Sequence, residues 1–181
     1  MSEEKHGRTI LFFDKPNMDF IEKENLRRKI NHNKFFAFFK KEKEELYVRF
    51  YWQSNEVESP YRKHLNLLRV YLRAVYGIRL ISIETNKDVD IAILNDMLTI
   101  LFDVDDNSQR PKKIILCSGD KDFGAVLGLI KRRLNNVQIT VISGKKHCSE
   151  VLEKISDETI FVEDMVKDNE NLLLGFSDPI E

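Results

Sequence analysis

Five aspartates of this sequence share one kind of position, because each follows an apolar segment that has the composition of a β-strand. They are Asp14, Asp88, Asp90, Asp120 and Asp122. If such carboxylates converge on one rim, their charges repel and raise the pKa of the closest members. A hard divalent cation removes that repulsion, and all-oxygen ligands suit Mg²⁺ or Mn²⁺. Such an ion lowers the pKa of a bound water and offsets charge on a phosphate, so we expect chemistry at a phosphate group.

These aspartates also have structural interpretations, because an aspartate after a strand often caps the next helix. Thr85 and Asp88 are spaced as in a capping box, and Asp122 could cap its helix or pair with the helix dipole. Asp14 is harder to explain as a cap, because Pro16 removes one of the donors that it could serve. Asp90 lies in an otherwise apolar helical segment, where an acid needs a partner or a raised pKa.

A zinc site is not expected. The two cysteines, Cys117 and Cys148, lack metal-site spacing, and the adjacent His147 and Cys148 cannot both face one ion from a helix. Cys117 falls within an apolar strand and is expected to be a buried, inert thiol.

The elements that must position the aspartates alternate between strands and helices. The predicted strands are Thr9–Phe13, Leu46–Trp52, Arg79–Ile83, Lys113–Cys117, Gln138–Ile142 and, less regular, Thr159–Val162. The predicted helices are Met18–Ile30, His32–Lys43, Tyr61–Tyr76, Asp88–Phe102, Phe123–Leu134 and His147–Ile155. This alternation predicts a three-layer α/β/α fold with a central, mainly parallel sheet of five to six strands, Rossmann-like in layout. In such sheets, sites form beyond the carboxyl ends of the strands, which is where the aspartates stand.

The bulk composition agrees with one globular domain. The chain has 181 residues, 42% of them hydrophobic and 33% charged, and its net charge of -1 supplies no global basic field for nucleic acid. The start MSEEKHGRTILFF does not have the pattern of a signal peptide, and no stretch is apolar enough to cross a bilayer. The expected location is cytoplasmic.

Three motifs together resemble those of the NYN domain, a branch of the PIN-like nucleases. They are Asp14-x-x-Asn17, Lys87-x-x-Asp90 followed by Asp96-Met97-Leu98, and Ser118-Gly119-Asp120-Lys121-Asp122-Phe123, which the strand segment VQITVIS follows at a distance. Their order and spacing cover roughly residues 8–155. The resemblance implies that residues 1–163 form a PIN-like domain, and the acidic, weakly patterned residues 164–181 are expected to be a loosely attached tail.

The resemblance also implies an activity, Mg²⁺- or Mn²⁺-dependent endonucleolytic cleavage of RNA, with Asp14, Asp90, Asp120 and Asp122 as metal ligands. Asn17 would position the metal shell or the substrate. Asp96, Ser118 and Asp88 would have secondary roles; Asp96 lies about 9 Å along the helix from Asp90, too far for both to bind one ion directly. Asp88 stands where the family usually has glycine, and its extra charge could alter the number of metal ions.

Basic residues near the same rim are expected to contact RNA phosphates. They are Arg62, Lys63, Lys87, Lys121, Lys145 and Lys146, with Lys15 beside the first motif. Lys131, Arg132 and Arg133 fall mid-helix and are expected to form a solvated face. The expected partner is single-stranded or structured RNA, and a homodimer is a further possibility.

Two other phosphate-processing families fit less well. A haloacid-dehalogenase phosphatase needs Asp-x-Asp after its first strand, where Pro16 stands at the third position. A Toprim nuclease needs Glu where Asp14 stands. The main alternative comes from another class: a PIN-like RNA-binding or complex-assembly module without turnover.

Overall fold

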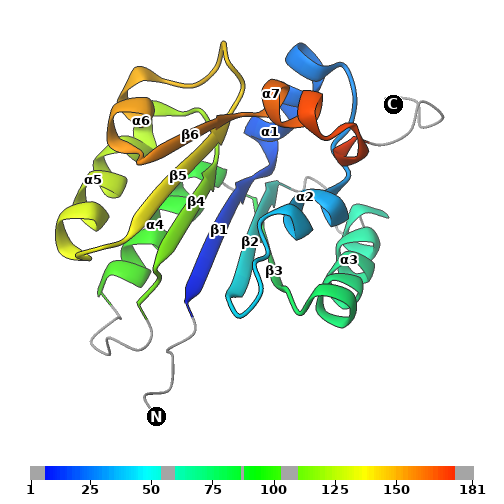
Figure 1. Cartoon of the computed structure of the whole chain (residues 1–181), viewed down its shortest axis with the longest axis horizontal. Coiled ribbons are helices and arrows are strands. Elements are labelled where there is room, and N and C mark those ends of the chain that lie inside the picture. The colour runs from blue at the N-terminus through cyan, green and yellow to red at the C-terminus, as the bar shows by residue number, and fades with distance from the viewer. Residues whose placement is uncertain (1–6, 54–59, 87, 103–109, 174–181) are drawn as a thin grey trace.

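The computed structural model of the chain describes residues 7–53, 60–86, 88–102 and 110–173. Its centre is a six-stranded sheet in the order β3-β2-β1-β4-β5-β6 (Figure 1). The strands are β1 (Arg8–Asp14), β2 (Glu45–Gln53), β3 (Arg79–Thr85), β4 (Lys113–Cys117), β5 (Gln138–Ser143) and β6 (Glu158–Phe161). All five neighbouring pairs are parallel, so the predicted fold class is confirmed, with no antiparallel strand in this sheet.

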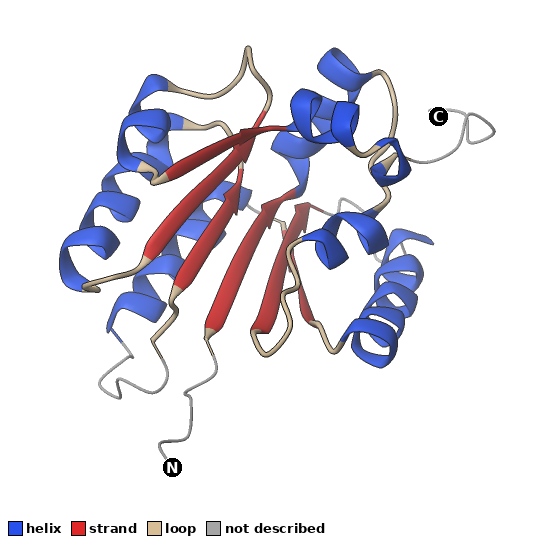
Figure 2. Ribbon diagram, in the orientation of Figure 1, coloured by secondary structure: helices blue, strands red, loops and turns tan. Residues whose placement is uncertain are grey.

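Helices cover both faces of the sheet (Figure 2). One face carries α1 (Lys15–Ile21), the π-helical turn Glu22–Leu26, α2 (His32–Phe38), α3 (Pro60–Tyr76), α7 (Val162–Asp168) and the 3-10 turn Glu170–Leu172. The other face carries α4 (Val89–Phe102), α5 (Gly124–Arg133) and α6 (Glu150–Ile155), with the 3-10 turn Lys121–Phe123 leading into α5. No helix in these described ranges has both the length and the apolar character needed to cross a bilayer.

The protein has one hydrophobic core on each face of the sheet, and strand β1 contributes side chains to both. Leu11 and Phe13 pack with the α1–α3 side, whereas Ile10 and Phe12 pack with the α4–α6 side. The alternation follows from the pleat of a strand, which turns successive side chains to opposite faces. It explains why the segment is apolar at every position.

The strand order reverses at β1. The chain runs outward through β2 and β3 and then returns to the other flank of β1 as β4. A parallel sheet leaves a crevice at such a reversal, beyond the carboxyl ends of the two strands. Here these ends carry Asp14 on β1 and the segment from Ser118 to Asp122 after β4.

Three predicted helices are shorter than expected. The segment His147–Ile155 is helical only from Glu150, with Ser149 as the cap, so His147 and Cys148 lie before the helix. The segment Met18–Ile30 was expected to be one helix, but α1 passes into a π-helical turn that ends at Leu26, and the next residue, Arg27, has a φ of 52°. The segment His32–Lys43 is helical only to Phe38. These boundaries depend on tertiary packing, which short local patterns do not encode.

The expectation of a loose tail is wrong for the part that the structure describes. Met165, Val166 and Leu172 are buried in the core beside α2, and the backbone of Leu173 bridges that of Ile30. These few apolar residues stand among acids, so their burial depends on α2, which lies far away in the sequence. Residues 174–181 lie outside the described ranges, and the division of the chain after residue 163 stays a prediction.

Candidate active site

Three aspartates from three elements line one cleft at the crevice between β1 and β4. Asp14 ends β1, Asp90 lies in the first turn of α4, and Asp120 follows β4. The cleft has a volume of about 450 Å³, and Asn17 and Asp88 are also among its lining residues. The structure therefore brings together most of the residues predicted for the site.

Asp14 is almost completely buried, with 2% of its surface exposed. It accepts a hydrogen bond from the backbone N–H of Asn17 at 3.2 Å and another from the hydroxyl of Ser118. Burial, and to a smaller extent the charges of Asp90 and Asp120, raise its pKa to about 7, although both hydrogen bonds oppose the shift. Asp14 thus caps α1 despite Pro16, because the donor that it uses belongs to the residue after the proline.

The segment after β4 is held by its own hydrogen bonds. The Ser118 hydroxyl accepts from the N–H of Asp120 at 3.3 Å, and the Asp120 carboxylate accepts from the N–H of Asp122 at 2.9 Å. Asp120, and not Asp122, is therefore the cap of the following turn. A side chain on Gly119 would meet the carbonyl oxygen of His147 at 1.9 Å, so only glycine fits there.

Asp90 opens α4, where Asp88 acts as the cap by accepting from the N–H of Asp90 at 3.0 Å. Burial is the largest cause that raises the pKa of Asp90, to about 6, and the charges of Asp88, Asp120 and Asp122 add to it. Asp122 does not line the cleft, but its charge reaches Asp90. The charges of neighbouring carboxylates thus add to burial in raising the pKa of Asp90.

The residues fit a hard divalent cation by their chemistry. The side-chain atoms of the lining that can ligate a cation are carboxylate and amide oxygens, and the negative charges there would be offset by a cation. Within the described ranges, no three His, Cys, Asp or Glu side chains are arranged to ligate one ion together. Mg²⁺ does not require that, because it usually keeps several waters and takes one or two carboxylates directly.

Comparison with known proteins places the chain in a family. The profile of the NYN domain matches residues 8–163, which is most of the chain. The chain belongs to the NYN-domain family. NYN domains are part of the PIN-like superfamily, so a nuclease-type function is indicated.

The fold of this NYN domain also occurs in a solved structure. The crystal structure of VPA0982 from Vibrio parahaemolyticus, described as a protein of unknown function, matches with a TM-score of 0.70 and 21% identity. The match covers 96% of this chain and 100% of the other, and it bears on the fold alone. A comparison with curated proteins gives no match.

Asp96 of the NYN domain does not line the cleft. Its carboxylate accepts hydrogen bonds from the guanidinium of Arg49, at 2.5 Å, and from the hydroxyl of Tyr51, both on β2. The ion pair of Arg49 with Asp96 is half-buried, and it neutralises a carboxylate that stands among the mainly apolar residues of α4. We therefore assign Asp96 a structural role in joining α4 to β2.

The basic residues predicted to contact RNA are spread along the same edge of the NYN domain. Arg62 makes two hydrogen bonds to Glu84, at 2.8 and 2.7 Å, and Lys145 pairs with Asp164 at 2.5 Å. Lys63, Lys121 and Lys146 are exposed, after β2, β4 and β5 respectively. Lys87 lies outside the described residues. The carboxyl edge of the sheet thus carries exposed cations, although none of them is among the residues that line the acidic cleft.

Sequence reasoning missed Gln53, which lines the cleft from the end of β2. Asp14 pairs in register with Tyr51, so Gln53 stands two residues beyond the level of Asp14. The sequence could have pointed to Gln53, because this residue directly follows the predicted strand Leu46–Trp52, as Asp14 follows Thr9–Phe13. Its amide offers both a donor and an acceptor to the cleft.

Proposed function

We propose that this NYN domain is a metal-dependent endoribonuclease that hydrolyses RNA phosphodiester bonds at the acidic cleft. The observation that carries the proposal is the convergence of Asp14, Asp90 and Asp120, from three elements, at the crevice where the strand order reverses. The raised pKa values of Asp14 and Asp90 support it, because each is due in part to the charge of another carboxylate of the cleft.

The residues proposed to hold the ion, directly or through its bound waters, are Asp14, Asp90 and Asp120, with Asp122 at the rim. A bound Mg²⁺ or Mn²⁺ would supply an activated water and offset charge on the phosphate that is attacked. The chain itself holds the ligands in place: Ser118 and the N–H of Asn17 fix Asp14, and the N–H of Asp122 fixes Asp120. Preorganised groups of this kind need little rearrangement when charge develops, which is how an active site gains most of its rate.

RNA is the proposed substrate, and the cations after β2, β4 and β5 would contact its phosphates. A cytoplasmic location is part of the proposal, because Cys117 and Cys148 are both free thiols. Free thiols persist in the reducing cytosol, whereas disulfides prevail in secreted proteins.

The test is Mn²⁺-dependent cleavage of a generic single-stranded RNA by the wild type and by Asp120→Asn. The amide keeps the shape of the side chain and can still accept the N–H of Asp122, so the variant should fold. We expect its cleavage rate to fall on the order of a hundredfold or more, as on removal of one preorganised electrostatic interaction. RNA binding should persist, since the rim becomes less acidic.

The alternative is an RNA-binding or complex-assembly module without turnover. One observation favours it: the described acidic side chains do not form a ready cluster of three ligands. Unchanged cleavage in Asp120→Asn, or none in the wild type with either metal, would remove the nuclease proposal and leave this alternative as the better account.

A further inference from the structure

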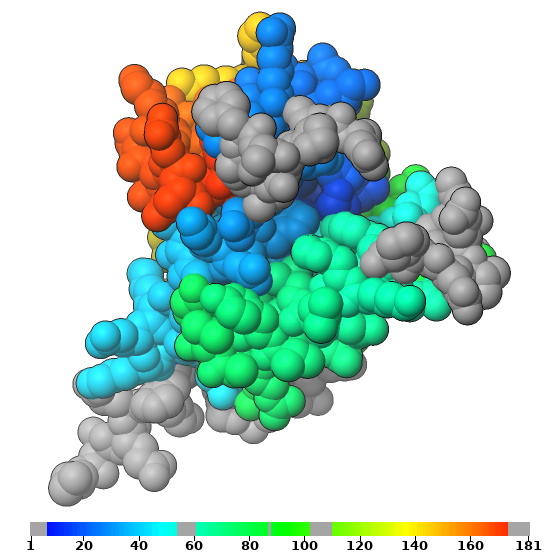
Figure 3. Space-filling view, turned by 90° about the vertical axis from the view of Figure 1, so that its right-hand side faces the viewer, coloured from blue at the N-terminus to red at the C-terminus, as the bar shows by residue number. Residues whose placement is uncertain are grey.

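A second cavity lies on the α1–α3 side of the sheet, apart from the acidic cleft. It has a volume of about 360 Å³ and opens between the π-helical turn, the start of α2 and the first turns of α3. In the space-filling view (Figure 3) the blue surface of the α1–α2 region lies between the green surface of α3 and the orange-red surface of α7. A volume of this size is within the range of small-ligand pockets.

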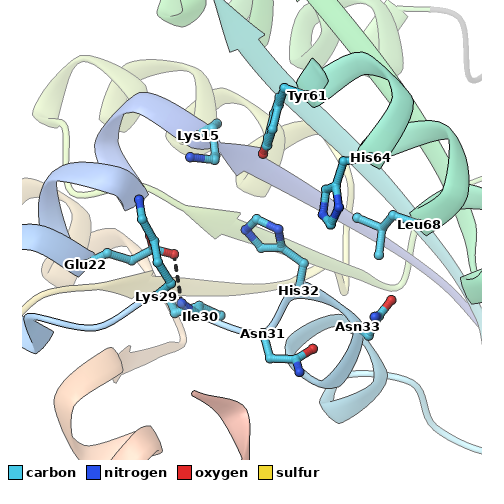
Figure 4. A pocket seen from close by; sticks show the side chains of 10 residues that line it. All are labelled: Lys15, Glu22, Lys29, Ile30, Asn31, His32, Asn33, Tyr61, His64 and Leu68. Carbon is cyan, nitrogen blue, oxygen red and sulfur yellow. Dashed lines mark hydrogen bonds and ion pairs between the residues drawn. The ribbon is translucent and has the colours of Figure 1, made fainter. Parts of the chain in front are cut away.

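His32 lies in the middle of this cavity's lining residues (Figure 4). Its ring packs against Phe13, Phe36 and Phe50, with centroids 5.4–5.9 Å apart. Burial is the largest cause that lowers its pKa, to about 3, and the positive charges of Lys15, His64 and Lys29 add to the effect. The imidazole is therefore neutral and has one donor and one acceptor nitrogen.

The Nε2 atom of His32 has no hydrogen-bond partner in the described part of the chain, and neither does Oδ1 of Asn33, the next residue in the sequence. A buried polar atom without a partner destabilises the folded state, and an apolar side chain would pack there at less cost. Both atoms belong to residues that line the cavity. This arrangement is suited to a ligand that brings hydrogen-bonding groups of its own.

The wall opposite His32 is aromatic. The hydroxyl end of Tyr61 points toward His32, and the Tyr61 ring stacks on that of His64 with centroids 6.0 Å apart (Figure 4). Leu68 and Ile30 add apolar surface. Flat, largely apolar walls with a few polar atoms suit a planar ring that has polar edges.

Two lysines complete the lining. The ammonium group of Lys15 lies 5.4 Å from the centroid of the Tyr61 ring and pairs with the carboxylate of Asp19. That of Lys29 lies 3.3 Å from the carboxylate of Glu22 and 3.6 Å from that of Asp19. Lys15 directly follows Asp14, and its neighbours Pro16 and Asn17 line the acidic cleft. The cavity and the cleft are therefore adjacent, with the first turn of α1 between them.

We propose that this cavity binds one nucleotide of the RNA strand, next to the bond that is cut in the acidic cleft. The base would lie between Tyr61 and His32, with its polar edge toward Nε2 of His32 and Oδ1 of Asn33. The phosphate would lie near Lys15 and Lys29. The inference rests on the proposed nuclease function for the identity of the strand, while the nucleotide site itself can be tested without any cleavage.

The chain contains its own reporter for this site. Trp52 is the single tryptophan, and its ring meets the Tyr61 ring edge-on with centroids 5.5 Å apart. Titration of the metal-free protein with a single-stranded RNA hexamer, and separately with each of AMP, GMP, CMP and UMP, should change Trp52 fluorescence to saturation. The hexamer should bind at least tenfold more tightly than any mononucleotide, because its other phosphates meet the cations of the rim.

Two variants test the lining, each with a matched control. His32→Leu should weaken hexamer binding about tenfold, which corresponds to about 1.4 kcal/mol, without lowering the melting temperature. His147→Leu is the control, because His147 also packs on a phenylalanine, Phe20, but lies outside the cavity. Lys29 and Lys131 are both in ion pairs, with Glu22 and Asp157 respectively. Lys29→Met should weaken binding severalfold, because Lys29 would also contact the phosphate in the cavity, whereas Lys131→Met should not.

The outcomes separate this inference from the proposed function. Unchanged hexamer affinity in folded His32→Leu and Lys29→Met would overturn the inference, even if wild-type RNA cleavage is intact. Mononucleotides that bind as tightly as the hexamer would also overturn it, because the site would then hold a free nucleotide. Loss of binding in both variants, in a protein that cleaves no RNA, would support the nucleotide site and refute the nuclease proposal.

Discussion

The side-chain oxygen of Asn17 accepts a hydrogen bond from the backbone N–H of Gly119 at 3.1 Å. The two residues are 102 positions apart in the chain, and they join the segment after β1 to the segment after β4. The same two segments carry Asp14 and Asp120. This bond therefore sets the spacing of two carboxylates across the crevice, which gives Asn17 a positioning role.

Asn17→Ala should reduce RNA cleavage about tenfold or more, because it frees the segment after β4 from the end of β1. Stability should fall by only about 1 kcal/mol, the usual net contribution of one hydrogen bond. Cleavage rates and urea unfolding measure the two effects. Asn169→Ala is a matched control, since it also removes one amide hydrogen bond, to the carbonyl of Met165 at 3.2 Å. Equal losses of activity in both variants would show that Asn17 acts through stability alone.

Asp90→Asn should stabilise the metal-free protein at neutral pH. The pKa of Asp90 in the folded state, about 6, lies above its ordinary value of 3.8, so the folded protein holds the proton more tightly. This contribution to stability is present below about pH 4 and is lost as the pH rises through 6. The melting temperature of the variant should thus exceed that of the wild type at pH 7. The difference should be equivalent to about 1–2 kcal/mol, because solvent screens the charge of this half-exposed carboxylate, and it should shrink at pH 4.

With saturating Mn²⁺, the wild type should melt at a higher temperature than Asp90→Asn. An ion that binds only the folded state raises its stability by mass action, and the wild type has one more ligand charge than Asp90→Asn. Melting curves with and without Mn²⁺ for both proteins make the comparison. Identical melting of the two proteins, with and without the metal, would exclude a cation site at this cleft.

Asp96→Asn should affect stability and leave cleavage within a fewfold range. The substitution removes the charge that faces the half-buried guanidinium of Arg49, and charge-assisted hydrogen bonds of this kind contribute about 1.5–3 kcal/mol. Urea unfolding measures the loss, and Arg49→Met in the same background should recover part of it. A hundredfold loss of cleavage in a folded Asp96→Asn protein would contradict the structural role.

The three layers of the fold, the ends of the strands and most residues of the acidic cleft were predictable from local sequence. Lys113–Cys117 matches β4 residue for residue because a strand covered on both faces must be apolar throughout. Asp14, Asp90 and Asp120 could be placed on one rim because parallel strands all end at the same edge. These inferences needed only the spacing of apolar residues in each predicted strand and the position of each aspartate after that strand.

What the sequence did not reveal depends on partners far along the chain. The partner of Asp96 comes from β2, and nothing near Asp96 in the sequence points to Arg49. The burial of Met165 and Val166 likewise depends on the hydrophobic core on the α1–α3 side of the sheet. His32 had no local signal, since only the fold surrounds it with Phe13 and Phe50.

The exposed cations of the sheet edge should dominate the salt dependence of RNA binding. Replacing Lys63 and Lys146 by alanine should weaken binding, and the plot of log affinity against log salt should become flatter by about 0.7 for each phosphate that is no longer neutralised. Arg62→Ala and Lys145→Ala should have smaller effects, because Glu84 and Asp164 already offset these two charges. Anisotropy titrations of a labelled single-stranded RNA at several salt concentrations measure the slopes.

The control for this prediction is the triplet Lys131, Arg132 and Arg133 in the last turn of α5, at the far edge of the sheet from the cleft. All three side chains are exposed, and the ammonium group of Lys131 already pairs with Asp157 at 2.5 Å. Neutralising the triplet removes more charge than the pair Lys63 and Lys146, so a nonspecific field effect would make it the more damaging change. If contact at the acidic edge governs binding, the pair must have the larger effect on both affinity and slope. The opposite ranking would place the RNA along α5 and move the binding surface away from Asp14 and Asp120.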